Sequence, residues 1–180
     1  MRSVVLLLIA CAAVISAGEA TRGYELGAGG LAIHAPTTWA PVRGQGGAAL
    51  VVRGPAPADL GTAAERSRPV ITVALHPGLG SVDGDAFARQ CREDLAGLLA
   101  SFAPVSEGSV ELGGRRWMVL RYRFAVGHLT WEQVLRTTVV DGTGVCVTCS
   151  CAADAIARWE VEFDAAITSL GRSRPTLDAR

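Results

Sequence analysis

The chain has 180 residues, 49% of them hydrophobic, and its 17 basic residues balance 17 acidic ones. This length and composition fit one ordinary globular domain and exclude a collagen-like repeat, a disordered chain and a multispan membrane protein. The lack of a basic excess also removes the usual electrostatic signature of a nucleic-acid-binding protein. All the basic residues are arginine, a bias that a GC-rich coding sequence explains, so arginine abundance is not evidence of an anion site.

The N-terminus predicts export. Arg2 precedes an uncharged run over residues 4–17, which matches a signal peptide and is shorter than the roughly 18 residues of a spanning helix. We expect a leader of residues 1–17, with cleavage after Ala20 as the alternative. The sequence Leu-Ile-Ala-Cys ending at Cys11 resembles a bacterial lipobox, which makes Cys11 a candidate for lipidation. The product is therefore a periplasmic or secreted protein, or one held at the membrane by a lipid.

The first half of the mature chain predicts short strands separated by loops. Leu31–Pro36 is predicted to be a short strand that ends at proline, and β-branched residues predict further strands at Ala48–Val52 and Val70–Leu75. Trp39 is expected to fill one end of the core. Residues 53–69 are rich in proline and charge, which predicts a surface loop where binding residues could lie.

An amphipathic helix is predicted over Ser81–Phe102. Ser81 or Asp83 is its expected N-cap, and Pro104 follows its end. Its apolar positions recur every three or four residues and so lie on one buried stripe: Phe87, Cys91, Leu95, Leu98 and Phe102.

A meander of antiparallel strands follows, because glycine-rich turns separate four extended segments. In the second segment Met118, Leu120, Tyr122 and Phe124 alternate with arginines, which predicts one buried and one partly solvated sheet face. The segments are Val105–Leu112, Trp117–Val126, Leu129–Val140 and Val145–Cys151.

A second helix is predicted over Ala152–Leu170, and residues 172–180 are expected to be a disordered tail. Residues 18–171 then form a single α+β domain, with a central antiparallel sheet of five to seven strands and two main helices. The buried stripe of the last helix comprises Ile156, Trp159, Phe163, Ile167 and Leu170.

The order of these features resembles the DcrB-like group of exported bacterial proteins, within the PsbP-like fold group. The resemblance is carried by the strand that enters Pro36-Thr37-Thr38-Trp39, the long helix, the hairpin Leu112-Gly113-Gly114-Arg115, Gln133 in the next strand, and the closing Ile167-Thr168-Ser169-Leu170. It implies a sheet packed against helices as an α/β sandwich. Members of this fold group act mainly as accessory, binding or assembly factors, so the resemblance implies no catalytic residue set. We also expect no cofactor.

Cysteines are the most informative side chains. If Cys11 leaves with the leader, four remain in a compartment that permits disulfides. Cys149 and Cys151 share one side of their strand and Cys146 faces the other, so we expect Cys91 to pair with Cys149 or Cys151. A metal site at Cys146, Cys149 and Cys151 is the less favoured alternative, because the strand divides these thiols between two faces.

A basic patch is the other candidate site. Arg115, Arg116, Arg121 and Arg123 surround Trp117, and such a patch would suit an anionic head group or an acidic partner. The scattered histidines His34, His76 and His128 are interpreted as solvated.

We therefore predict a non-enzymatic, exported accessory or binding protein of the cell envelope. Its partner is an envelope protein or a lipid-like ligand, with no nucleic acid and with membrane contact only through a lipid anchor. The alternative is a lipid-anchored ligand-binding protein, while an enzyme or a metal-binding protein is less favoured.

Overall fold

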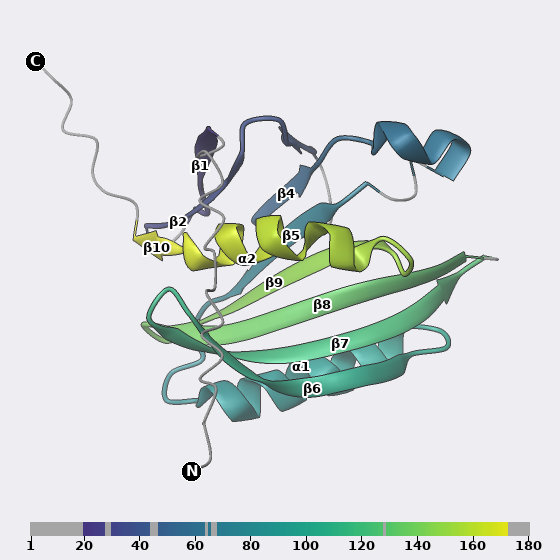
Figure 1. Cartoon of the computed structure of the whole chain (residues 1–180). Helices are drawn as coiled ribbons and strands as arrows, with labels where there is room; N and C mark the ends of the chain where they lie inside the picture. The colour runs from purple at the N-terminus through teal and green to yellow at the C-terminus, as the bar shows by residue number, and fades with distance from the viewer. Residues whose placement is uncertain are drawn as a thin grey trace, which may run out of the picture.

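The structure is a computed structural model that describes residues 20–27, 30–43, 47–63, 65, 68–127 and 129–172. The expected leader, Cys11, His128 and residues 173–180 therefore lie outside the described residues. Within them, two antiparallel sheets and two α-helices form a fold of the predicted α+β class (Figure 1). No described helix has both the length and the apolar character needed to cross a membrane.

The central sheet has seven strands, in the order β3-β4-β5-β9-β8-β7-β6. Its long strands are the predicted meander, joined by turns at glycines, and the Asp141-Gly142 turn has positive φ at both residues, as a tight hairpin needs. The strands are β3 (Ala40–Pro41), β4 (Leu50–Arg53), β5 (Val70–His76), β6 (Ala103–Leu112), β7 (Arg115–Val126), β8 (Leu129–Val140) and β9 (Thr143–Ala152).

A small second sheet was not predicted. It has the order β1-β2-β10 and consists of β1 (Thr21–Glu25), β2 (Leu31–Pro36) and β10 (Gly171–Arg172). The predicted strand Leu31–Pro36 thus belongs to this sheet and not to the central one. Strand β1 is almost wholly exposed, so it has no apolar alternation to reveal it, and Arg172 pairs with Leu31 instead of beginning the tail.

Helix α1 (Gly84–Leu98) is shorter than predicted at both ends. Its N-cap is Asp83, which accepts a hydrogen bond from the Ala86 backbone N–H at 2.7 Å. The backbone becomes extended at Leu99, so Leu98 is 80% exposed and Leu99 packs against the sheet in its place. The predicted burial of Leu98 is therefore wrong, because the helix ends before its stripe is complete.

The closing helix is also shorter than predicted. Ala152 ends β9, a 3₁₀ turn η2 (Ile156–Trp159) follows, and α2 covers Glu160–Thr168. Its predicted stripe is confirmed, since all five residues are buried: Ile156, Trp159, Phe163, Ile167 and Leu170. Trp39 is confirmed in the core, where its ring meets those of Trp159 and Phe163 edge to face at 6.2 and 6.0 Å.

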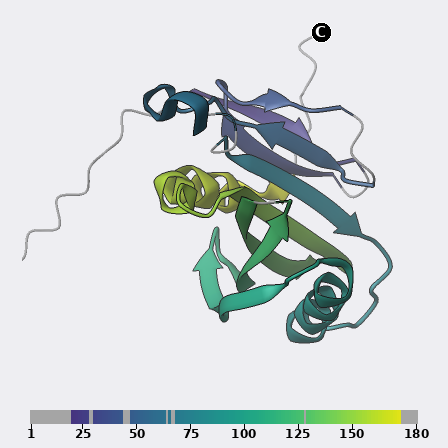
Figure 2. The ribbon, with the colours of Figure 1, turned by 90° about the vertical axis from the view of Figure 1, so that its right-hand side faces the viewer.

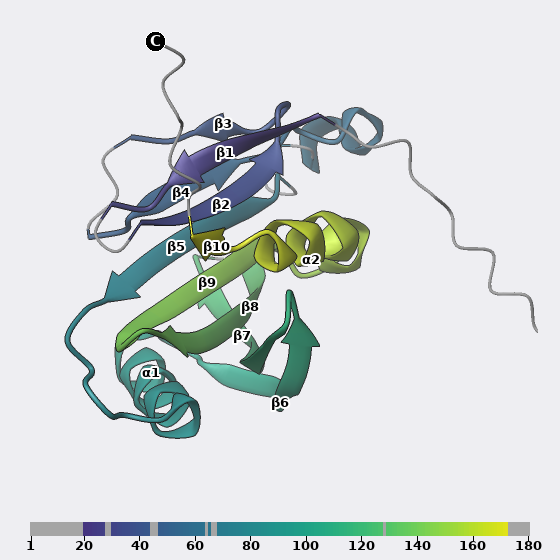
Figure 3. The same cartoon turned by 90° about the vertical axis from the view of Figure 1, so that its left-hand side faces the viewer.

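The two helices lie on opposite faces of the central sheet (Figures 2 and 3). Helix α1 packs on β7 and β8 from one side, while α2 and the small sheet cover the other side. Strand β7 shows the division, because Leu120 and Tyr122 pack with α1, whereas Trp117 belongs to the α2 core and is fully buried. The face that carries Arg121 and Arg123 stays partly solvated, as predicted, because these side chains are 30% and 52% exposed.

Gly144 of β9 lies in close contact with α1 and with the segment that leads into it. A Cβ at this position would lie 2.5 Å from Phe87 Cζ and 2.7 Å from Leu79 Cδ1. We expect Gly144→Ala to lower the free energy of unfolding by about 1–3 kcal/mol, as overpacked cores do. Urea denaturation measures the loss, and Gly108→Ala, whose Cβ would meet nothing within 4 Å, is the control. Equal stability of the two variants would contradict the packing argument.

Candidate functional site

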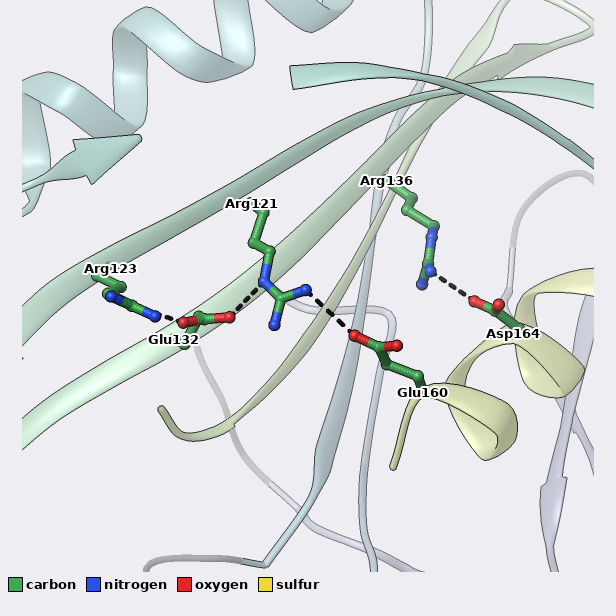
Figure 4. A network of polar contacts seen from close by, with 6 residues as sticks. All are labelled: Arg121, Arg123, Glu132, Arg136, Glu160 and Asp164. Carbon is green, nitrogen blue, oxygen red and sulfur yellow. Dashed lines mark hydrogen bonds and ion pairs between the residues drawn. The ribbon is translucent and has the colours of Figure 1, made fainter. Parts of the chain in front are cut away.

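The predicted basic patch is part of an ion-pair network around one buried carboxylate (Figure 4). Glu132 on β8 is 0% exposed, and its carboxylate accepts hydrogen bonds from Arg121 Nε and, at 2.6 Å, from Arg123 Nε, both on β7. Arg121 also donates from Nη1 to Glu160 Oε1 on α2, at 3.1 Å. A neighbouring pair joins Arg136 Nη2 to Asp164 Oδ1 at 2.5 Å. These contacts fasten α2 to the sheet.

Arg115, Arg121 and Arg123 share one face of β7, as the alternation predicts, but they do not form a free basic surface. Arg115 donates to the Leu170 backbone carbonyl near the end of α2. Arg116 lies on the opposite face and pairs with Asp85 of α1 at 3.6 Å. These arginines already have partners, which are carboxylates of the neighbouring strand and of the two helices and one backbone carbonyl. Their role in binding an anion stays a prediction.

The 53–69 loop does not stand apart from the domain. It contains a 3₁₀ turn, η1 (Ala58–Ala63), whose Asp59 Oδ2 accepts a hydrogen bond from Arg158 Nη1 at 2.9 Å. Because Arg158 belongs to η2, this ion pair connects the loop to the segment that leads into α2. His34 and His76, the described histidines, are exposed.

A cleft lies between α1 and the strands β6, β7 and β8. It has two adjoining hollows of about 240 and 910 Å³, which share Asp85, Met118 and Thr137 in their linings. Its apolar part is made by Met118, Leu120 and Leu135. Clefts of this size with an apolar floor and a few polar groups are typical of small-molecule sites.

Thr137 supplies an unusual polar group in this cleft. The residue is 2% exposed, and its hydroxyl has no hydrogen-bond partner in the part of the chain that the structure describes. An unsatisfied buried hydroxyl is costly, and native proteins rarely leave one without a partner, protein or otherwise. The sequence pattern points to this position, because Thr137 is a polar residue between Leu135 and Val139, which are apolar residues on the same face of the strand.

Charged side chains form the rim of the cleft. Arg92 pairs with Glu107 of β6 at 3.0 Å, and Arg116 pairs with Asp85, so both acids already have a basic partner. Arg89, one turn before Arg92 on α1, lines the same hollow and takes part in no ion pair among the described residues. Among the described residues of the rim, Arg89 is thus a positive charge without an acidic partner, and no sequence pattern marks it.

The cysteines divide between the two sides of the central sheet. Cys91 Sγ of α1 lies 3.6 Å from Cys146 Sγ of β9. Cys149 and Cys151 lie in the α2 core at 0% exposure, and burial raises the pKa of both thiols to about 12. The predicted pairing of Cys91 with Cys149 or Cys151 is therefore wrong, because α1 packs on the side of β9 that carries Cys146.

The placement of the thiols on two sides of β9 also argues against the predicted metal site at Cys146, Cys149 and Cys151. Cys146 on one side of β9 cannot converge with Cys149 and Cys151 on the other, as the strand alternation predicts. Within the described ranges, no group of three or more histidine, cysteine or acidic residues has a geometry that would hold a metal ion.

Comparison with known proteins finds similarity in structure alone. No protein-family model matches the sequence, and no curated protein does. CyanoP, the cyanobacterial PsbP of Synechocystis, is 18% identical with a TM-score of 0.58, and the match covers 92% of this chain and 98% of that one. LpqN of Mycobacterium tuberculosis, which is involved in cell envelope biogenesis, is 15% identical with a TM-score of 0.57, covering 81% and 87%.

The fold also occurs outside bacteria. The Ran-binding protein Mog1p of Saccharomyces cerevisiae is 11% identical with a TM-score of 0.58, and the match covers 89% of this chain and 99% of that one. Identities this low show the fold alone. The seven-stranded antiparallel sheet, the small second sheet and the helices on opposite faces thus make up a PsbP-like fold.

Proposed function

We propose that the chain is an exported, non-enzymatic binding protein of the bacterial cell envelope, of the DcrB-like group. Its ligand is an amphipathic molecule with one anionic group, held in the cleft between α1 and the central sheet. The observation that carries the proposal is the buried, unpartnered hydroxyl of Thr137 in a cleft with an apolar floor.

The chemistry of the cleft favours an anion joined to an apolar body. The Thr137 hydroxyl donates one hydrogen bond to an oxyanion, and the guanidinium of Arg89 on the same hollow supplies the positive charge. Met118, Leu120 and Leu135 offer apolar surface to the rest of the ligand. The rim acids Asp85 and Glu107 are neutralised by arginines, so they oppose the anion less than isolated carboxylates would.

Two further observations support the cell envelope as the place of action. The N-terminal run of the sequence has the pattern of an export signal, whether Cys11 is removed or lipidated. LpqN, which shares the fold, is involved in cell envelope biogenesis.

Calorimetric titration tests the ligand class. The probes are lysophosphatidylglycerol, which is anionic, and lysophosphatidylcholine of the same chain length, which is zwitterionic, both below their micellar concentrations. We expect the anionic probe to bind more tightly. We also expect Arg89→Gln and Thr137→Val each to weaken its binding about tenfold or more, because hydrogen bonds to charged groups contribute about 1.5–3 kcal/mol.

Arg22→Gln is the matched control, because Arg22 is an exposed arginine of β1 outside the cleft. It should leave binding unchanged. Equal affinity for the two lipids, or binding of the anionic probe that both cleft variants retain, would overturn the proposed ligand. So would the absence of any binding.

A further inference from the structure

We infer that Cys91 and Cys146 are a site of oxidative cross-linking, where an oxidant that itself carries a disulfide converts the two thiols into a disulfide. The bond fastens α1 to the central sheet beside the cleft. Neither the cross-link nor its test depends on the ligand proposed above.

The geometry brings these two sulfurs together from rigid elements. Cys91 lies in the middle of α1, one turn after Phe87 and one turn before Leu95, and both of these pack toward the sheet. Cys146 lies inside β9, where Ala74 of β5 and Thr137 of β8 are its neighbours in the ladder. The Sγ atoms are 3.6 Å apart, so a bond of about 2.05 Å requires a closure of only about 1.5 Å.

The other described cysteines are excluded as partners by their positions. Cys149 and Cys151 point into the α2 core, so the sheet separates them from α1. Cys91 is half-buried, whereas Cys146 is buried beneath the helix, so Cys91 is the more exposed residue of the pair.

This arrangement gives each sulfur a role in the exchange. The thiol of Cys146 hydrogen-bonds to Cys91 and lowers the pKa of Cys91, which favours the Cys91 thiolate as the nucleophile. That thiolate attacks the disulfide of the oxidant, forms a mixed disulfide and releases one sulfur of the oxidant as a thiolate. The released thiolate takes up the proton that Cys91 has lost.

The second step closes the cross-link. The thiol of Cys146 attacks Cys91 Sγ in the mixed disulfide, and its proton passes to the other sulfur of the oxidant, which leaves as a thiol. The two protein thiols lose two electrons and two protons, and the disulfide of the oxidant becomes two thiols. Because Asp85, Arg89 and Arg92 belong to the same helix, the bond also holds one wall of the cleft in place.

Peptide mapping without reduction tests the inference in two preparations. One is the exported chain recovered with its own leader processed, and the other is the full chain carrying C11S, equilibrated with oxidised glutathione. In both we expect a peptide pair joined through Cys91 and Cys146, two hydrogen masses lighter than the separate peptides. After unfolding, alkylation without reductant should label Cys149 and Cys151 alone.

Three variants sharpen the result. C91A and C146A should each abolish the cross-link, and C149A should retain it. Four alkylated thiols in the glutathione preparation, or a link from Cys91 to Cys149 or Cys151, would overturn the site. If the cross-link forms with glutathione but is missing from the exported chain, the inference that the cell forms this disulfide would be overturned. None of these outcomes would change the result of the lipid titration.

Discussion

Replacing Glu132 with alanine is expected to lower the free energy of unfolding by about 3 kcal/mol, because breaking a buried ion pair leaves its partners without compensation. Glu132 is 0% exposed and receives hydrogen bonds from Arg121 and Arg123. Those arginine side chains are 30% and 52% exposed, so they recover part of their hydration when the carboxylate is lost. This places the effect at the lower end of the range for buried pairs.

Urea denaturation of Glu132→Ala and of a matched surface variant measures the effect. Glu107→Ala removes a carboxylate that is 49% exposed and paired with Arg92, and exposed pairs contribute at most about 1 kcal/mol. Glu132→Gln should fall between the wild type and Glu132→Ala, since it keeps one acceptor oxygen. A loss at Glu132 no greater than that at Glu107 would show that the network does not hold α2 on the sheet.

Reduction of the oxidised chain is expected to lower its free energy of unfolding by about 4 kcal/mol, which rests on the inferred Cys91–Cys146 bond. The two cysteines are 55 residues apart, and the chain-entropy model of a cross-link gives a value of this size for such a loop. For a domain of this length, that loss corresponds to a fall in Tm of roughly 10 °C.

Calorimetry with and without a phosphine reductant measures the shift. C91S removes one partner, so its Tm should not respond to the reductant and should lie near that of the reduced wild type. Should the reductant leave the wild-type Tm unchanged, the bond would be either absent or without effect on stability.

The two predictions concern opposite sides of the same sheet. The Glu132 network connects β7 and β8 to α2, whereas the thiol pair connects β9 to α1. Other ion pairs join the same elements, since Arg136 of β8 pairs with Asp164 of α2 and Arg92 of α1 pairs with Glu107 of β6.

Much of the fold follows from local sequence patterns. Strands β6 to β9 were placed within about two residues at each end, because alternating side chains and glycine turns are short-range signals. The buried stripe of the last helix was likewise read from spacings of three and four residues, and all five of its residues are buried. The division of Cys146 from Cys149 and Cys151 follows from the same period of two.

Other features leave little local trace. Strands β1 and β10 are short or exposed, so the sequence alone does not reveal the small sheet. The ends of α1 depend on where the backbone turns away at Leu99, which shifts the packing position from Leu98 to its neighbour. Such boundaries are set by packing against the sheet and not by helix propensity.

The sequence by itself determined which side chains share a face, and only the tertiary structure decided what each face meets. Alternation puts Cys146 on one side of β9, and it puts Arg121 and Arg123 together on one side of β7. It does not say which helix covers either of these sides. The structure places α1 over Cys146 and α2 over the arginines, and it brings Thr137 and Arg89 together in one cleft. The physical reason is range: a repeat of two or 3.6 residues is a local property, whereas the choice of helix for each face depends on contacts between residues far apart in the chain.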